Sequence, residues 1–78
     1  MLLCSVSIKG LDGWIHSLET EAGSLAEAAY AGVREWSRLW WYNPDAVIEV
    51  RAGDECWRIS ARGADEWHRE QSQKARLK

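Results

Sequence analysis

Four side chains of this sequence could do chemistry together: Cys4, Cys56, His16 and His68. Thiolate sulfur and imidazole nitrogen are preferred zinc ligands, and a cysteine beside a histidine base can act as a nucleophile. The spacing favours neither chemistry, because the sequence has no C-x-x-C or H-x-x-H pair and nothing local marks either cysteine as activated. We therefore expect no metal, no cofactor and no catalytic residue, and an enzyme is the least favoured class of protein.

Length and composition limit what the chain can be. Its 78 residues make one domain. The six Trp and two Tyr, with no Phe, must supply much of the core, since a buried aromatic ring removes roughly 150–250 Å² from water. The net charge of -2 gives no argument for nucleic acid. With no secretory segment and no membrane span in the sequence, we expect a cytoplasmic protein with reduced cysteines and no membrane contact.

The first 22 residues are predicted to form a β-hairpin. Cys4, Val6 and Ile8 alternate with polar residues, as in a half-buried strand. Asp12-Gly13 is a strong turn signal. A second alternating segment follows from residue 14 to residue 21.

An amphipathic helix should follow. Ser24 and Glu27 have the spacing of a capping box. Apolar residues then recur in one stripe at helical spacing, at positions 25, 28, 29, 32, 33, 36, 39 and 40. Asn43-Pro44 should end the helix, because proline disfavours helical geometry at the residue before it. The prediction is a helix of about four to five turns.

The second half repeats the strand pattern. Two strands, residues 46–51 and 56–60, surround a Gly53-containing turn, and a weaker helix anchored by Trp67 follows. Residues 1–70 should form the domain, and residues 71–78 a basic, fraying tail. The sequence thus predicts an α+β fold in ββαββα order: a mainly antiparallel sheet of about four strands, one long helix on one face and a short C-terminal helix. The expected core contains Leu25, Ala29, Val33, Trp36 and Trp40 of the helix, with Val6, Ile8, Leu18, Ile48, Val50, Trp57 and Ile59 of the strands.

The outer face of the predicted helix is unusual. At 100° per residue from Leu25, Trp40 falls at about 60°, on the core stripe, and Trp41 at about 160°, on the outer side. Arg34 and Arg38 share that outer side, four residues apart, with no acidic residue four positions away on the helix.

Three interpretations of this face stay open. The arginine stems could lie over the rings as local cation–π pairs. The face could be a protein interface, for which aromatic residues and arginine are favoured; the candidate residues are Tyr30, Arg34, Arg38, Trp41 and Tyr42. It could also stack on bases and contact phosphates; the candidate cations are Arg34, Arg38, Arg69, Lys74, Arg76 and Lys78.

The chain resembles a set of short, uncharacterised bacterial proteins. The resemblance covers residues 5 to about 70, in VSIKGLDGWIHSLETEAGSLAEAAYAGVREW and VIEVRAGDECWRIS, and implies no activity. A looser resemblance is to HicB-type antitoxins, whose core helix opens with a T/S-L-x-E-A run, here Ser24, Leu25, Glu27 and Ala28. The P-D-L-P-G-C-like strand ending and the separate DNA-binding domain of those antitoxins are missing from this sequence.

The function expected from the sequence is that of a small cytoplasmic protein-interaction module. Its partner would be a second copy, as a homodimer, or a larger protein. The alternative is a nucleic-acid-associated or antitoxin-like regulatory protein. An open sheet would offer a second route to association, because it leaves two strand edges to pair or protect.

Overall fold

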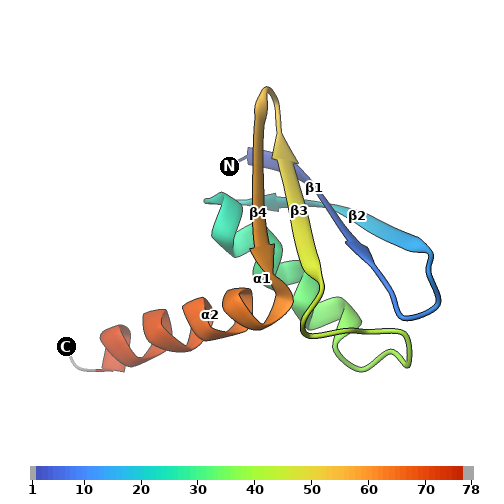
Figure 1. Ribbon diagram of the computed structural model, residues 1–78. Coiled ribbons are helices and arrows are strands. Elements are labelled where there is room, and N and C mark those ends of the chain that lie inside the picture. Colours follow the sequence, from blue (N-terminus) through green and yellow to red (C-terminus); the bar gives the residue numbers. More distant parts are fainter. Residues whose placement is uncertain (1, 77–78) are drawn as a thin grey trace.

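The chain folds as a four-stranded antiparallel sheet with two helices, in the predicted ββαββα order (Figure 1). The computed structural model describes residues 2–76, and the side chains of residues 2–71. Its elements are β1 (Leu2–Lys9), β2 (Ile15–Ala22), α1 (Leu25–Trp36), β3 (Val47–Ala52), β4 (Glu55–Ser60) and α2 (Ala61–Arg76).

The order of strands in the sheet is β2-β1-β3-β4. Strand β1 is central and pairs antiparallel with β2 over eight residue pairs and with β3 over four. Helix α1 packs on one face of the sheet, and α2 packs mainly against α1 and extends away from the sheet (Figure 1). Neither helix of the described residues 2–76 covers the opposite face of the sheet, which is here called the open face.

Glycine determines the geometry of both hairpin turns. In the first, the Gly10 N–H donates to the Trp14 carbonyl at 2.9 Å, and Gly13 has φ = 83°, which matches a three-residue loop closed by a left-handed glycine. In the second, Gly53 is the first of two turn residues and has φ = 60°. An L-residue at either position would be strained, so the sequence signals for both turns are confirmed.

Helix α1 begins as predicted and ends early. The Ser24 hydroxyl accepts from the Glu27 N–H at 3.2 Å, and the Glu27 carboxylate accepts from the Gly23 N–H at 2.8 Å. The helix stops at Trp36, and a tighter turn follows in which the Leu39 N–H donates to the Trp36 carbonyl at 2.9 Å. The prediction of a helix of four to five turns ended by Asn43-Pro44 is therefore wrong.

The core lies between α1 and the inner face of the sheet. Its buried residues alternate along β1 and β3 and recur along one side of α1. They are Cys4, Val6, Ile8, Ala22, Ala28, Ala29, Val33, Trp36, Trp41, Ile48, Val50, Ala61 and Ala64. Leu18, Leu25, Trp57 and Ile59 are partly buried against them.

The two adjacent tryptophans have exchanged their predicted roles. Trp40, predicted as core, is 77% exposed, and Trp41, predicted on the outer side, is 8% exposed. Helical spacing cannot place either ring, because the helix has already ended at Trp36. The turns that follow α1 bring the Trp41 ring close to the ring of Trp36, at the end of the helix.

Helix α2 is longer than the short helix predicted. Its first turn buries Ala61 and Ala64, and Trp67 is half-buried. The helix runs to Arg76, so it includes residues 71–76 of the segment that the sequence suggested would be a tail.

Candidate interaction surfaces

The residues of the predicted helix face do not form one surface. Tyr30 stacks on His68 of α2, with ring centroids 3.7 Å apart and planes within 9° of parallel. Trp41 is buried, while Arg34 and Arg38 are exposed. The face is broken because α1 ends before Arg38, so only Tyr30 and Arg34 keep their helical relation.

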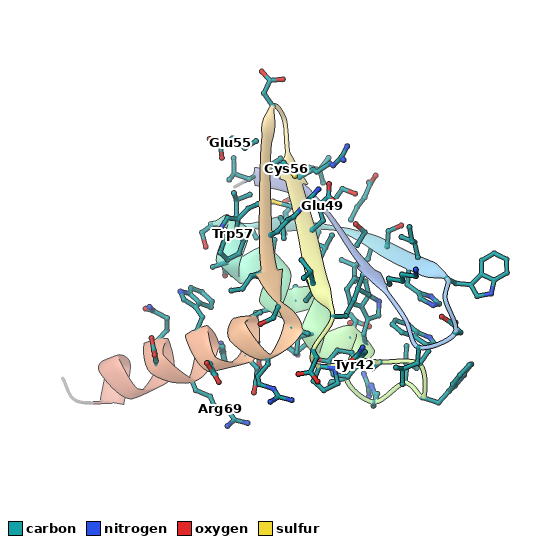
Figure 2. The ribbon with its side chains drawn as sticks, in the orientation of Figure 1. Tyr42, Glu49, Glu55, Cys56, Trp57 and Arg69 are labelled. Carbon is teal, nitrogen blue, oxygen red and sulfur yellow. The ribbon has the colours of Figure 1, made fainter. Side chains whose placement is uncertain are left out.

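Three of the five predicted residues do meet, in a shallow cavity of about 350 Å³ between the helices and the loop that follows α1. These are Tyr30, Arg34 and Tyr42, joined by Arg62 and Asp65 of α2. Burial raises the pKa of the Tyr42 hydroxyl above its usual value, and the Asp65 carboxylate raises it further, against the opposing effect of Arg62. The raised pKa favours the protonated hydroxyl of Tyr42 (Figure 2), which can act as a hydrogen-bond donor.

Trp41 joins the first hairpin turn to α1. Its ring stacks on His16 with centroids 3.6 Å apart, and it meets the Trp36 ring at 6.0 Å in a tilted arrangement. The Asp12 Oδ2 atom lies 3.1 Å from His16 Nε2, so the Asp12 carboxylate helps to hold the imidazole ring in place. The Leu11 N–H donates to the Trp41 carbonyl at 2.8 Å. Trp41, which the sequence suggested as part of a contact surface, is therefore a buried structural residue. Its contacts with the first hairpin turn and with the end of α1 are here called the Trp41 joint.

Gly10 leaves the space that Trp41 needs. A Cβ at this position would lie 2.9 Å from Trp41 Cε3 and 2.7 Å from Asp12 Oδ1. We expect Gly10→Ala to lower the free energy of unfolding by about 1–3 kcal/mol, because overpacking displaces the ring. Urea denaturation measures this, with Lys9→Ala as the exposed neighbouring control. An unchanged midpoint for Gly10→Ala would show that Trp41 does not pack here.

The four residues considered for metal binding or catalysis lie in separate places. Cys4 is buried under α1, whereas Cys56 lies on the open face, where its thiol donates to Glu49 Oε1 at 3.4 Å (Figure 2). His16 belongs to the Trp41 joint and His68 to the stack on Tyr30. Within the described part of the chain, no group of three or more His, Cys, Asp or Glu could hold a metal ion.

The cations considered for nucleic-acid binding are divided as well. Arg69 pairs with Asp65 at 3.1 Å. Arg34 lines a groove that also contains Glu19 and Glu35. The side chains of Lys74 and Arg76 lie outside the described residues, as does the whole of Lys78. Arg69 and Arg34, the two of these cations placed here, therefore each lie in surroundings that also contain carboxylates.

A different surface is apolar and exposed. The first hairpin turn and the loop after α1 lie at the same end of the molecule (Figure 1), joined by the Leu11–Trp41 hydrogen bond. Their exposed apolar side chains, with Val47 at the start of β3, are here called the apolar end: Leu11 (65% exposed), Trp14 (72%), Ile15 (74%), Leu39 (42%), Trp40 (77%) and Val47 (56%). The two tryptophans alone expose roughly 200–400 Å².

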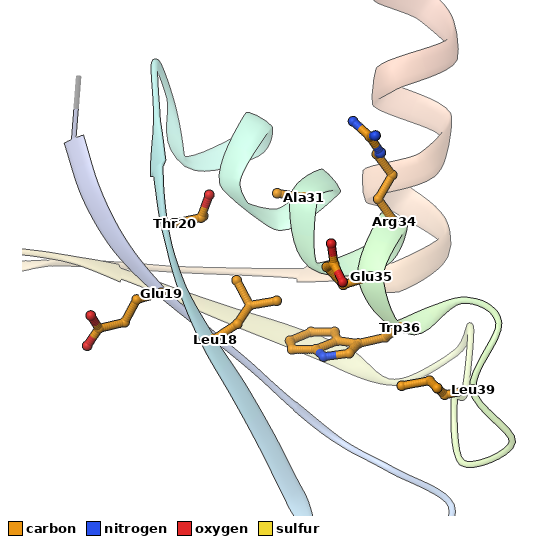
Figure 3. A pocket seen from close by; sticks show the side chains of 8 residues that line it. All are labelled: Leu18, Glu19, Thr20, Ala31, Arg34, Glu35, Trp36 and Leu39. Atoms are coloured by element: carbon orange, nitrogen blue, oxygen red, sulfur yellow. The ribbon is translucent and has the colours of Figure 1, made fainter.

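The second surface is a groove beside β2, of about 590 Å³. Leu18 of β2, Trp36 at the end of α1 and Leu39 in the loop after it provide its apolar wall (Figure 3). Arg34 and Glu35 of α1 stand at its rim. The groove lies directly against a strand edge that no strand of the described chain covers.

Two residues of the apolar end were not predicted as surface residues from the sequence: Trp14, which was in no candidate site, and Trp40, which was predicted as core. Trp14 follows the Asp12-Gly13 turn signal immediately, and a residue at the tip of a hairpin lies beyond the reach of the covering helix. The position of Trp14 directly after the turn could therefore have predicted that its ring is exposed. For Trp40 no local signal was available, because its exposure depends on where α1 ends.

Comparison of the chain with protein-family models, with curated proteins and with solved structures finds no match. Among the described residues, no helix is long and apolar enough to cross a membrane.

Proposed function

We propose that this chain is a small protein-interaction module and that the apolar end is its contact surface. The observation that carries the proposal is the exposure of Trp14 and Trp40, 72% and 77%, at one end of the molecule. Large apolar side chains that are exposed together at one end of a protein are typical of a surface that a partner covers. Tryptophan is also the residue type most enriched among the side chains that dominate binding energy.

The alternative of a nucleic-acid-associated or antitoxin-like protein is less well supported. Exposed tryptophans could stack on bases, but such binding also needs a basic surface that follows the phosphates. Arg38 and Lys9 are the exposed cations nearest to the apolar end in sequence. The net charge of -2 provides no general attraction to a polyanion.

Site-specific photo-crosslinking in cells tests this proposal. We replace Trp14 or Trp40 with the photoreactive residue p-benzoylphenylalanine, with the same replacement at Leu3 as the matched control. Leu3 is also exposed, at 63%, and lies at the far end of β1. We expect protein adducts of discrete mass from positions 14 and 40 and little from position 3.

Two results would contradict the proposal. Equal yields at all three positions would mean that the apolar end has no special partner. Adducts at positions 14 and 40 that disappear on nuclease treatment would favour the nucleic-acid alternative instead.

A further inference from the structure

We propose that the free edge of β2 pairs antiparallel with β2 of a second copy of this chain, with the two-fold axis at Leu18. The inference rests on the proposed function, because it assigns Trp14 of the apolar end to a contact between copies. Three features of the molecule support this pairing: the long free edge of β2, the groove beside it, and the charges that select one register.

The edge of β2 is long and regular. All eight residues from Ile15 to Ala22 pair with β1 without a bulge, and the strand contains neither proline nor lysine. Bulges, proline and lysine are among the devices that protect an edge from pairing with another chain, and the charged residues that this strand does carry are Glu19 and Glu21. The other edge strand, β4, has six residues and leads directly into α2. The β2 edge is therefore the better template for an added strand.

The groove beside β2 has room for side chains of an added strand. Leu18 is half-buried on the α1 side of the sheet, and Leu39 is 42% exposed across the groove. A strand added to β2 would point every second side chain into this space. Two copies related by a two-fold axis perpendicular to the sheet would each place Leu18 there, so the apolar walls would cover one another.

Backbone geometry limits the possible registers. The Gly10 N–H donates to the Trp14 carbonyl, and bonded and non-bonded pairs alternate along an antiparallel ladder. The even-numbered residues of β2 therefore direct their N–H and C=O groups toward β1. The odd-numbered residues, from Ile15 to Glu21, direct theirs toward the free edge. In a β2–β2 pair, odd residues must face odd residues.

Charge then selects among the allowed registers. With the axis at Leu18, Ser17 faces Glu19 of the second copy and Ile15 faces Glu21 of the second copy. Moving the axis to Glu19 places Glu19 directly opposite Glu19 of the second copy. Moving it to Thr20 places Glu19 of each copy opposite Glu21 of the other. Like charges directly opposite one another destabilise a sheet. Moving the axis to Ser17 shortens the paired segment from about seven residues to about five per copy.

The selected register gives a role to Trp14. The resulting sheet is continuous, and both α1 helices lie on the same face of it. Trp14, now 72% exposed, comes level with Ala22 of the second copy. The neighbouring α1 of that copy begins three residues later, at Leu25, so Trp14 would pack near its first turn. Trp40, equally exposed, has no contact in this arrangement.

Light scattering over a range of concentrations, with four variants, tests the proposal. Ser17 is exposed, so its replacement leaves the monomer fold intact. Ser17→Lys places two new opposite-charge pairs against Glu19 of the other copy, and Ser17→Glu places two like-charge pairs there. We expect the dimer Kd to change about 2- to 30-fold in each case, downward for Ser17→Lys and upward for Ser17→Glu. Trp14→Ala should weaken the dimer and Trp40→Ala should not.

The controls separate pairing from general charge effects. Ser5→Lys and Ser5→Glu make the same charge changes on the same sheet face, but on the central strand β1, where Ser5 lies opposite Glu19 and Arg51 of its own chain. Ser5 faces no residue of the second copy in the proposed dimer, so we expect a much smaller effect on Kd. Amide hydrogen exchange gives an independent readout. The N–H groups of Ser17 and Glu19 should exchange rapidly in the dilute monomer and slowly in the concentrated dimer.

Three outcomes would overturn the proposal. The first is a wild-type mass that stays monomeric up to the solubility limit. The second is a dimer whose Kd does not move in opposite directions for the two Ser17 variants. The third is a dimer that is lost with Trp40→Ala and indifferent to Ser17. The first two leave the proposed function to be judged by the crosslinks from position 40, and the third contradicts only the β2 pairing.

Discussion

Replacing Trp41 with alanine is expected to lower the free energy of unfolding by about 3–5 kcal/mol, whereas the same change at Trp40 stays within about 0.5 kcal/mol. The Trp41 ring is 8% exposed and stacked on His16, so its removal leaves a cavity between the first hairpin turn and α1. The Trp40 ring is 77% exposed and leaves none. The two residues are adjacent and identical in type, which makes each the control for the other.

Urea denaturation followed by circular dichroism measures the difference between them. A domain of this length has a total stability of roughly 4–12 kcal/mol, so Trp41→Ala is expected to remove a large share of it and to shift the denaturation midpoint clearly. Equal denaturation midpoints for the two variants would show that the loop after α1 does not hold Trp41 in the core. A larger loss for Trp40→Ala would restore the arrangement predicted from helical spacing.

The second large effect is expected at the centre of the sheet. Ile48 of β3 is fully buried at 0% exposure and pairs with Ile8 and Ile59 on the two neighbouring strands. Ile48→Ala should cost about 2–5 kcal/mol, because it removes buried methyl groups and leaves a cavity. Val47, one residue earlier on the opposite face, is 56% exposed. Val47→Ala should cost about 1 kcal/mol or less, through strand propensity alone.

This pair of variants tests the register of β3. A slip of one residue would exchange the faces on which Val47 and Ile48 lie. Thermal or urea unfolding of both variants gives the answer. If Val47→Ala were the more damaging change, the β1–β3 pairing would be one residue out of register.

The sequence was informative wherever local chemistry decides the structure. Ser24 and Glu27 capped the helix at the residue expected, because a capping box involves only groups within a few residues of one another. Gly13 and Gly53 provided the left-handed backbone that the two hairpin turns require. The alternation in β1 and β3 identified Val6, Ile8, Ile48 and Val50 as core, because a strand with one buried face must alternate.

The candidate surface was harder to read, because it depends on where α1 stops. The pattern of apolar residues predicted that the helix continues to residue 42. On such a helix, Arg38 and Trp41 would lie on the same face as Tyr30. The helix stops at Trp36, and no proline or glycine marks that position in the sequence. Beyond that point the chain turns, and the Trp41 ring packs on His16 of the first hairpin and on Trp36, the last residue of α1.

The sequence by itself therefore determined the type and order of the elements of this protein and most of the inner face of the sheet, but not where its helices end. The choice between Trp40 and Trp41 was left to the tertiary structure. The cause is physical: either ring could be buried, and the space beside Gly10 and His16 that accepts Trp41 exists only once the β1–β2 hairpin lies against the end of α1. The free edge of β2 could likewise be identified only from the tertiary structure, because the order of strands in a sheet depends on contacts between distant residues.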